Sequence, residues 1–182
     1  MRFERTLFYS DLSPAADCAL PFAVGIGRSA PGCHLYVVHV LPSPYRFYAE
    51  IVEPGLALGL NPEMALVAEK TLEERYGQML GGGGPEISFH ALVGVEGVEL
   101  VRFVKKHRVE AIVMAASVAE ARMGGVQATL RAFLAKRSPC PVLLVQPARQ
   151  GARKGSRKGP AKVLEMRDFR GPRRRPMAEG SD

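Results

Sequence analysis

Several residue types that mark common protein classes are scarce in this sequence. Its 182 residues include no tryptophan, four histidines and three cysteines. The cysteines are odd in number and widely separated, at Cys18, Cys33 and Cys140. This spacing argues against a disulfide framework and against a zinc site built from paired cysteines. Burial is the expected role of Cys18 and Cys140, while a redox role stays open for Cys33.

Long hydrophobic runs are missing as well. No apolar run approaches the roughly 18 residues with which a helix spans a membrane. Charged Arg2, Glu4 and Arg5 stand where a secretion leader would begin its apolar core. We therefore expect a cytoplasmic protein. The apolar fraction of 47% is enough for a core, and the length fits one domain with room for a tail.

Negative charge is scarce at one end of the chain. Residues 148–182 hold eleven basic and four acidic residues, so they carry the whole net charge of +7, and the rest of the chain is balanced. Glycine, proline and serine are also frequent there. The sequence therefore predicts a folded domain over residues 1–147 and a disordered basic tail over residues 148–182. A neutral body argues against nucleic-acid binding by the folded domain itself.

Two roles are open for the tail. It either keeps the protein in solution, or it attaches the protein electrostatically to nucleic acid, an anionic membrane or an acidic partner. The apolar residues Val163 to Met166, with Phe169, fit a transient helix or a docking peptide within the tail.

Strand and helix patterns alternate along residues 1–147. Short apolar or β-rich runs predict five strands, at Thr6–Ser10, His34–Val40, Ile87–Val93, Ala111–Met114 and Val142–Val145. Between them, helical periodicity and proline caps predict four helices, beginning near Ser13, Asn61, Val98 and Val126. Such alternation is typical of an α/β fold with one parallel, doubly wound sheet. Ligands of these sheets bind beyond the carboxyl ends of the strands, so we look for a site in the loop after Met114.

Two irregular stretches interrupt this pattern. Residues 41–60 are rich in proline and glycine, and their aromatics either pack on the body or cover a pocket: Tyr45, Phe47 and Tyr48. The glycines Gly81 to Gly84 predict a flexible connection. This segment does not fit a phosphate-binding loop, because no helix begins directly after it.

The sequence gives no support for an enzyme. It contains neither a G-x-S-x-G nor an H-E-x-x-H motif. The histidines lack the spacing of metal ligands, so structural roles are expected for all four: His34, His39, His90 and His107. Asp11, at the end of the first strand, has one of two roles. It either takes part in catalysis or metal binding, or, together with Ser13, it accepts hydrogen bonds from the N–H groups of the following turn.

Three segments resemble the universal stress protein family. They are the opening T-L-F-Y-S-D-L-S-P-A-A-D-C-A-L and the strand that ends His39-Val40. The third comprises Met114, at a strand end, and the closing S-P-C-P-V-L-L-V, which begins at Ser138. The resemblance covers Arg5 to Gln146. It implies a flavodoxin/Rossmann-like, five-stranded parallel open sheet of order 3-2-1-4-5 with helices on both faces. It also implies a homodimer that pairs through the last strand, Val142–Val145.

In the nucleotide-binding members of this family, a loop of pattern G-x2-G-x9-G-[ST] wraps the phosphates of ATP. Counting back from Pro139 places its three glycine positions at Ala115, Val118 and Ala128, and its hydroxyl position at Thr129. A phosphate cradle needs close backbone approach and often positive φ, which the β-branched Val118 disfavours. We therefore expect a regulatory, stress-response domain, without catalysis and without a cofactor, that does not bind ATP through this loop.

Two alternatives remain open. The first is a divergent ATP or AMP site, in which the matching family positions contact the nucleotide: Asp11, Val40, Ala115, Arg122 and Thr129. Gly124 and Gly125 would then shape a different phosphate-binding turn. The second alternative is a nucleic-acid-associated protein attached through the basic tail.

Overall fold

A computed structural model describes residues 3–29, 32–42, 62–80, 84–120, 129–146 and 162–165. The predictions for the aromatics of residues 41–60, for residues 81–83 and for Arg122, Gly124 and Gly125 lie outside these residues. So do those for the tail, apart from residues 162–165.

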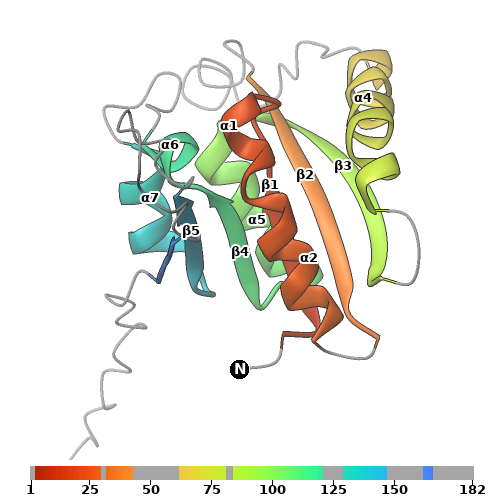
Figure 1. Cartoon of the computed structure of the whole chain (residues 1–182). Coiled ribbons are helices and arrows are strands. Elements are labelled where there is room, and N and C mark those ends of the chain that lie inside the picture. Colours follow the sequence, from red (N-terminus) through yellow and green to blue (C-terminus); the bar gives the residue numbers. More distant parts are fainter. Residues whose placement is uncertain are drawn as a thin grey trace, which may run out of the picture.

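One six-stranded sheet forms the centre of the fold (Figure 1). Its strands are β1 (Arg5–Tyr9), β2 (His34–Pro42), β3 (Glu86–Gly94), β4 (Ala111–Ala115), β5 (Val142–Gln146) and β6 (Lys162–Glu165). They lie in the order β3-β2-β1-β4-β5-β6, and the first five are parallel. The predicted α/β fold and strand order 3-2-1-4-5 are thus confirmed. All five residues of β4 are buried, as expected of a central strand covered on both faces.

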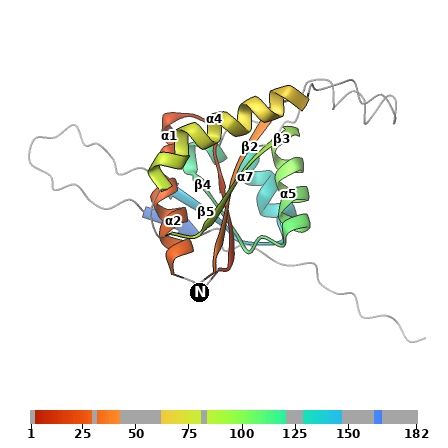
Figure 2. The same cartoon turned by 90° about the vertical axis from the view of Figure 1, so that its right-hand side faces the viewer.

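Helices cover both faces of the sheet (Figure 2). One face carries α1 (Pro14–Asp17), α2 (Leu20–Arg28) and α4 (Pro62–Leu80); the other carries α5 (Glu96–His107) and α7 (Leu130–Arg137). Right-handed crossovers explain this division, because the chain moves from β1 towards β3 and then returns to β4 and β5. The first predicted helix is split into two. Pro21, at the start of α2, has no N–H with which to continue the helix from α1.

The buried side of α4 follows a spacing of four residues. Ala68, Leu72, Tyr76 and Leu80 are each at most 7% exposed. Leu66, on the same helix, is 64% exposed and lies outside this buried side. The stripe continues from Leu72 back to Ala68 because residues i and i+4 share a helix face, whereas Leu66 lies about 120° away from that line.

A chain of buried and part-buried hydrogen bonds ties α4 to the end of β1. The Leu12 N–H donates to the Ser10 hydroxyl (2.9 Å), which lies 2.6 Å from the Tyr76 hydroxyl. Tyr76 in turn donates to the Asp17 carboxylate at 2.9 Å, so its oxygen accepts from Ser10. Arg75 binds the same carboxylate with two nitrogens, at 3.3 and 2.8 Å. This network holds α1, α4 and the β1–α1 turn together.

Strand β6 pairs antiparallel with β5, with Leu164 opposite Leu144 and Val163 opposite Val145. For residues 162–165 this differs from the expected disordered tail. Val163 is β-branched and Leu164 is aliphatic, and such residues fit a strand. The outer edge of β5 offers N–H and C=O groups with which this strand can pair. As a consequence, the edge through which a homodimer was predicted is already paired within the chain.

Candidate functional site

The candidate site lies where the sheet changes winding direction. β1 and β4 are neighbours, and the helices that follow them leave towards opposite faces. Such a switch point is where open α/β sheets bind ligands. Asp11 follows β1 and is exposed, whereas Ala115 ends β4 and is fully buried. Val40, near the end of β2, is 2% exposed and offers no polar side-chain group.

Asp11 organises the turn after β1. Its Oδ1 accepts a hydrogen bond from the Ser13 N–H at 3.0 Å. Ser13 then caps α1 by accepting from the Ala16 N–H at 3.3 Å, and Pro14 follows at the first helical position. Leu12, between them, has φ of 64°, a conformation that costs a non-glycine residue about 1–3 kcal/mol. Asp11 therefore has the turn-forming contact that the sequence offered as one of its two roles.

Two of the family's glycine positions fall on ordinary backbone. Ala115 has φ −68° and ψ 142°, and Val118 lies in the helical turn α6 (Ala116–Ala119). The Val118 side chain is only 4% exposed and belongs to the hydrophobic core. The chain thus forms a short helix where a glycine loop was considered, so alanine and valine fit without the strain of a positive φ. Side chains fill the space that glycines would leave open.

Thr129 is the N-cap of α7. Its φ of −75° and ψ of 153° are typical of this position, and its hydroxyl accepts from the Ala132 N–H at 3.2 Å. The hydroxyl that fits the family pattern is therefore engaged in starting the helix.

Among the described residues, two acidic side chains interact at this end of the sheet. Burial raises the pKa of Glu96, at the start of α5, and the Asp11 carboxylate raises it further. Burial also raises the pKa of Tyr9, with smaller contributions from Glu96 and Asp11. The negative charge of Asp11 therefore adds to the repulsion that a polyphosphate would meet near this turn.

Comparisons with known proteins fit this architecture. Residues 2–146 match the model of the universal stress protein family. The chain belongs to the universal stress protein family. The predicted resemblance is confirmed over nearly the same residues.

Three solved structures share the fold of this universal stress protein domain. The hypothetical protein MJ0577 is 18% identical, with a TM-score of 0.55 and coverage of 81% of this chain and 98% of the other. UspA from Lactobacillus plantarum is 18% identical, with a TM-score of 0.52 and coverage of 78% and 97%. A universal stress protein in complex with cAMP is 17% identical, with a TM-score of 0.54 and coverage of 80% and 98%. No curated protein matches the sequence closely.

Three histidines of the domain gather with two other aromatic side chains between β2, β3 and α5. This histidine cluster consists of His34, Tyr36, His90, Phe103 and His107. Ring centroids lie 4.1 Å apart for Phe103 and His107, 4.2 Å for His34 and Tyr36, and 5.8 Å for His90 and His107. Within the described parts of the chain, no group of three or more His, Cys, Asp or Glu is arranged to hold a metal ion.

The histidine cluster predicts a loss of stability in weak acid. Burial lowers the pKa of His90 and of His107. His107 and His34 lower the pKa of His90 further. Lys106 and His34 do the same for His107. Glu69 opposes this for His90. The unfolded chain, with a histidine pKa of about 6.5, then binds more protons than the folded one. Stability is therefore fully present above that pH and falls as the pH decreases below it.

Urea denaturation between about pH 7.5 and pH 5 measures this dependence. His107→Phe keeps a ring beside Phe103 and removes one proton site, so we expect a shallower decrease. The carboxylate of Glu110, whose pKa the Glu4 N–H and Arg5 lower against the effect of burial, loses its contribution only at more acidic pH. An unchanged slope in His107→Phe would contradict the assignment.

Two of the three cysteines of the domain are buried. Cys33 is 1% exposed and Cys140 is 5% exposed. Burial raises the pKa of both thiols, that of Cys140 to about 11, and burial also raises the pKa of Cys18. Since the thiolate is the reactive form, the redox role left open for Cys33 gains no support.

In the described residues, no helix is both long and apolar enough to cross a membrane.

Proposed function

We propose that this protein is a regulatory member of the universal stress protein family that catalyses no reaction and does not bind ATP through the family's glycine loop. The observation that carries the proposal is the burial of Val118 in the core, at a position where the loop requires glycine. A phosphate cannot approach a backbone that is already a helical turn covered by a packed side chain.

Two further observations support the proposal. Thr129 Oγ1 and Asp11 Oδ1 each accept a hydrogen bond from an N–H group of their own turn, so both side chains have a local role at the start of a helix. Asp11 and Glu96 also interact electrostatically, which places two acidic residues at this end of the sheet. A divergent adenine-nucleotide site is the alternative, and the complex of one relative with cAMP is the reason to test it.

Calorimetric titration with ATP, AMP and cAMP tests the proposal. Because the tail region carries a charge of +7 and attracts any polyanion, tripolyphosphate is the control ligand. We expect no saturable heat up to millimolar AMP and cAMP, and equal, salt-sensitive heats for ATP and tripolyphosphate. Micromolar binding of ATP that tripolyphosphate does not displace would contradict the proposal and favour the divergent site.

We also propose that β6 controls self-association of the domain. Dimerisation through the outer edge of β5 is excluded while Val163 and Leu164 pair with Val145 and Leu144. β6 has only four residues, and residues 147–161 connect it to β5. The strand of a second copy could therefore take the place of β6 beside β5. Release of β6, for example when the basic segment binds an anionic partner, would expose the edge to a second copy.

A further inference from the structure

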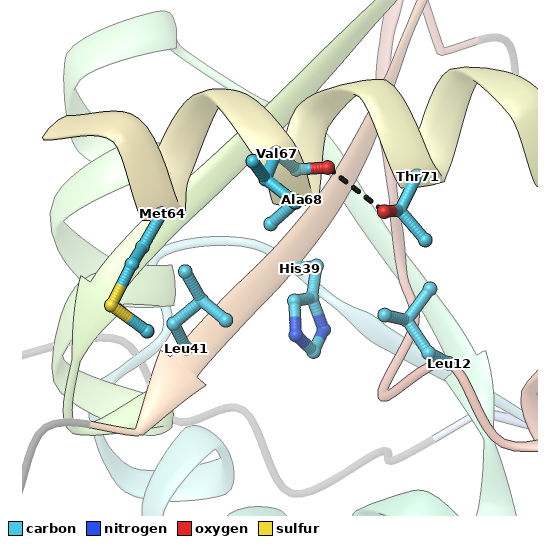
Figure 3. A pocket seen from close by; sticks show the side chains of 7 residues that line it. All are labelled: Leu12, His39, Leu41, Met64, Val67, Ala68 and Thr71. Carbon is cyan, nitrogen blue, oxygen red and sulfur yellow. Dashed lines mark hydrogen bonds between the residues drawn. The ribbon is translucent and has the colours of Figure 1, made fainter.

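A pocket of about 450 Å³ lies between α4 and the carboxyl ends of β1 and β2 (Figure 3). Its walls are apolar and come from Leu12, Leu41, Met64, Val67 and Ala68. Its wall includes Leu12, which lies between Asp11 and Ser13, but none of the family's described nucleotide-contact positions lines it. This volume is within the range of about 300–1,000 Å³ that is typical of small-molecule sites.

His39 supplies a polar group at the centre of the pocket. Its side chain stands between Leu41 and Leu12, and the residue is 9% exposed (Figure 3). Nδ1 lies 2.9 Å from the Ser10 carbonyl oxygen. A carbonyl only accepts, so Nδ1 carries the proton and Nε2 of the neutral ring carries a lone pair. Among the described residues, Nε2 has no hydrogen-bond partner.

The remaining features of the pocket define what it accepts. The Thr71 hydroxyl donates its proton to the Val67 carbonyl at 2.8 Å, so it has no proton left to donate to a ligand. None of the lining residues is an acid, a lysine or an arginine. Met64 and Val67 are 52% and 65% exposed and give the opening an apolar rim. Leu12 holds its wall position with a positive φ, the kind of backbone strain that concentrates at ligand sites.

We propose that this pocket binds a small, uncharged, mainly apolar molecule with one hydroxyl group, which donates a hydrogen bond to Nε2 of His39. The apolar walls supply affinity, and the buried acceptor supplies selection for the hydroxyl. No described lining residue is a lysine or an arginine that could balance the phosphates of a nucleotide. The inference does not rest on the proposed function, because none of the family's described nucleotide-contact positions lines the pocket.

The probe is 2-naphthol, and its methyl ether, 2-methoxynaphthalene, is the matched ligand without a donor. We expect 2-naphthol to bind at least about tenfold more tightly, since the ether leaves Nε2 unpaired. NMR of the imidazole nitrogens supplies a second readout: 2-naphthol, and not the ether, should shift the Nε2 resonance of His39.

Two substitutions of exposed residues on α4 locate the binding. Val67→Glu places a charge on the apolar rim, and Leu66→Glu places the same charge on a residue that is 64% exposed and does not line the pocket. We expect Val67→Glu to weaken 2-naphthol by at least about tenfold and Leu66→Glu to leave it unchanged. Equal affinity for naphthol and ether, equal effects of the two substitutions, or no binding up to the solubility of 2-naphthol would overturn the proposal.

Discussion

Replacing Tyr76 by alanine is expected to lower the free energy of unfolding by about 3–5 kcal/mol, the usual cost of removing a buried aromatic ring. Tyr76 is fully buried, and its ring meets that of Phe8 edge-on, with centroids 5.5 Å apart. Its hydroxyl links Ser10 to the Asp17 carboxylate. The substitution therefore leaves a cavity between α4 and β1 and breaks the hydrogen-bond chain that holds the β1–α1 turn.

Tyr76→Phe separates these two contributions. It keeps the ring and removes the hydroxyl, so Ser10 loses its acceptor and Asp17 keeps only Arg75. We expect a cost of about 1–3 kcal/mol. Met79→Ala, on the same helix and 60% exposed, is the control and should change stability by less than about 0.5 kcal/mol. Urea denaturation measures all three. Equal losses for Tyr76→Phe and Tyr76→Ala would show that the ring contributes nothing.

Leu164→Pro is expected to convert the protein from monomer to dimer. Proline removes an N–H and a strand conformation from β6 opposite Leu144, so the short strand should detach. Detachment leaves the apolar strand β5 as an open edge, which favours pairing with the same edge of a second copy. Leu164→Val is the control, because valine keeps a high strand propensity and should preserve the monomer.

Sedimentation velocity over a range of concentrations distinguishes the outcomes. The account predicts a monomer for the natural sequence and for Leu164→Val, and a reversible dimer for Leu164→Pro. A dimeric natural sequence would mean that β6 does not protect the edge. A monomeric Leu164→Pro would mean that β5 does not pair with itself, and the dimer predicted from the family resemblance would then have no support.

Local rules were sufficient for most of the fold. Apolar runs and caps located the five parallel strands, and the turn at Asp11 and Ser13 follows from short-range hydrogen-bonding preferences. The split between α1 and α2 was visible in Pro21 but was not predicted. α6 was read as a loop, although Ala116 and Ala119 favour a helix.

Features that depend on distant contacts could not be predicted. The strand β6 is four residues long in a segment whose composition indicates disorder, and it forms only because β5 offers an edge. The burial of Val118 depends on where α6 meets β5 and α1. The pocket at His39 depends on the distance and angle between α4 and β2. The periodicity of the sequence does not predict either of them.

The measurement that most directly tests the account is an NMR titration of the full chain with ATP, followed at the amides of Ala115, Val118 and Leu130. These residues lie where a phosphate loop would hold its ligand, so the titration distinguishes binding there from attraction to the basic segment. The account predicts no saturable shift of these three amides at millimolar ATP, whatever happens to residues after 147. Saturation at micromolar ATP, centred on Leu130 at the start of α7, would contradict it and show that the domain rebuilds a phosphate site without the family's glycines.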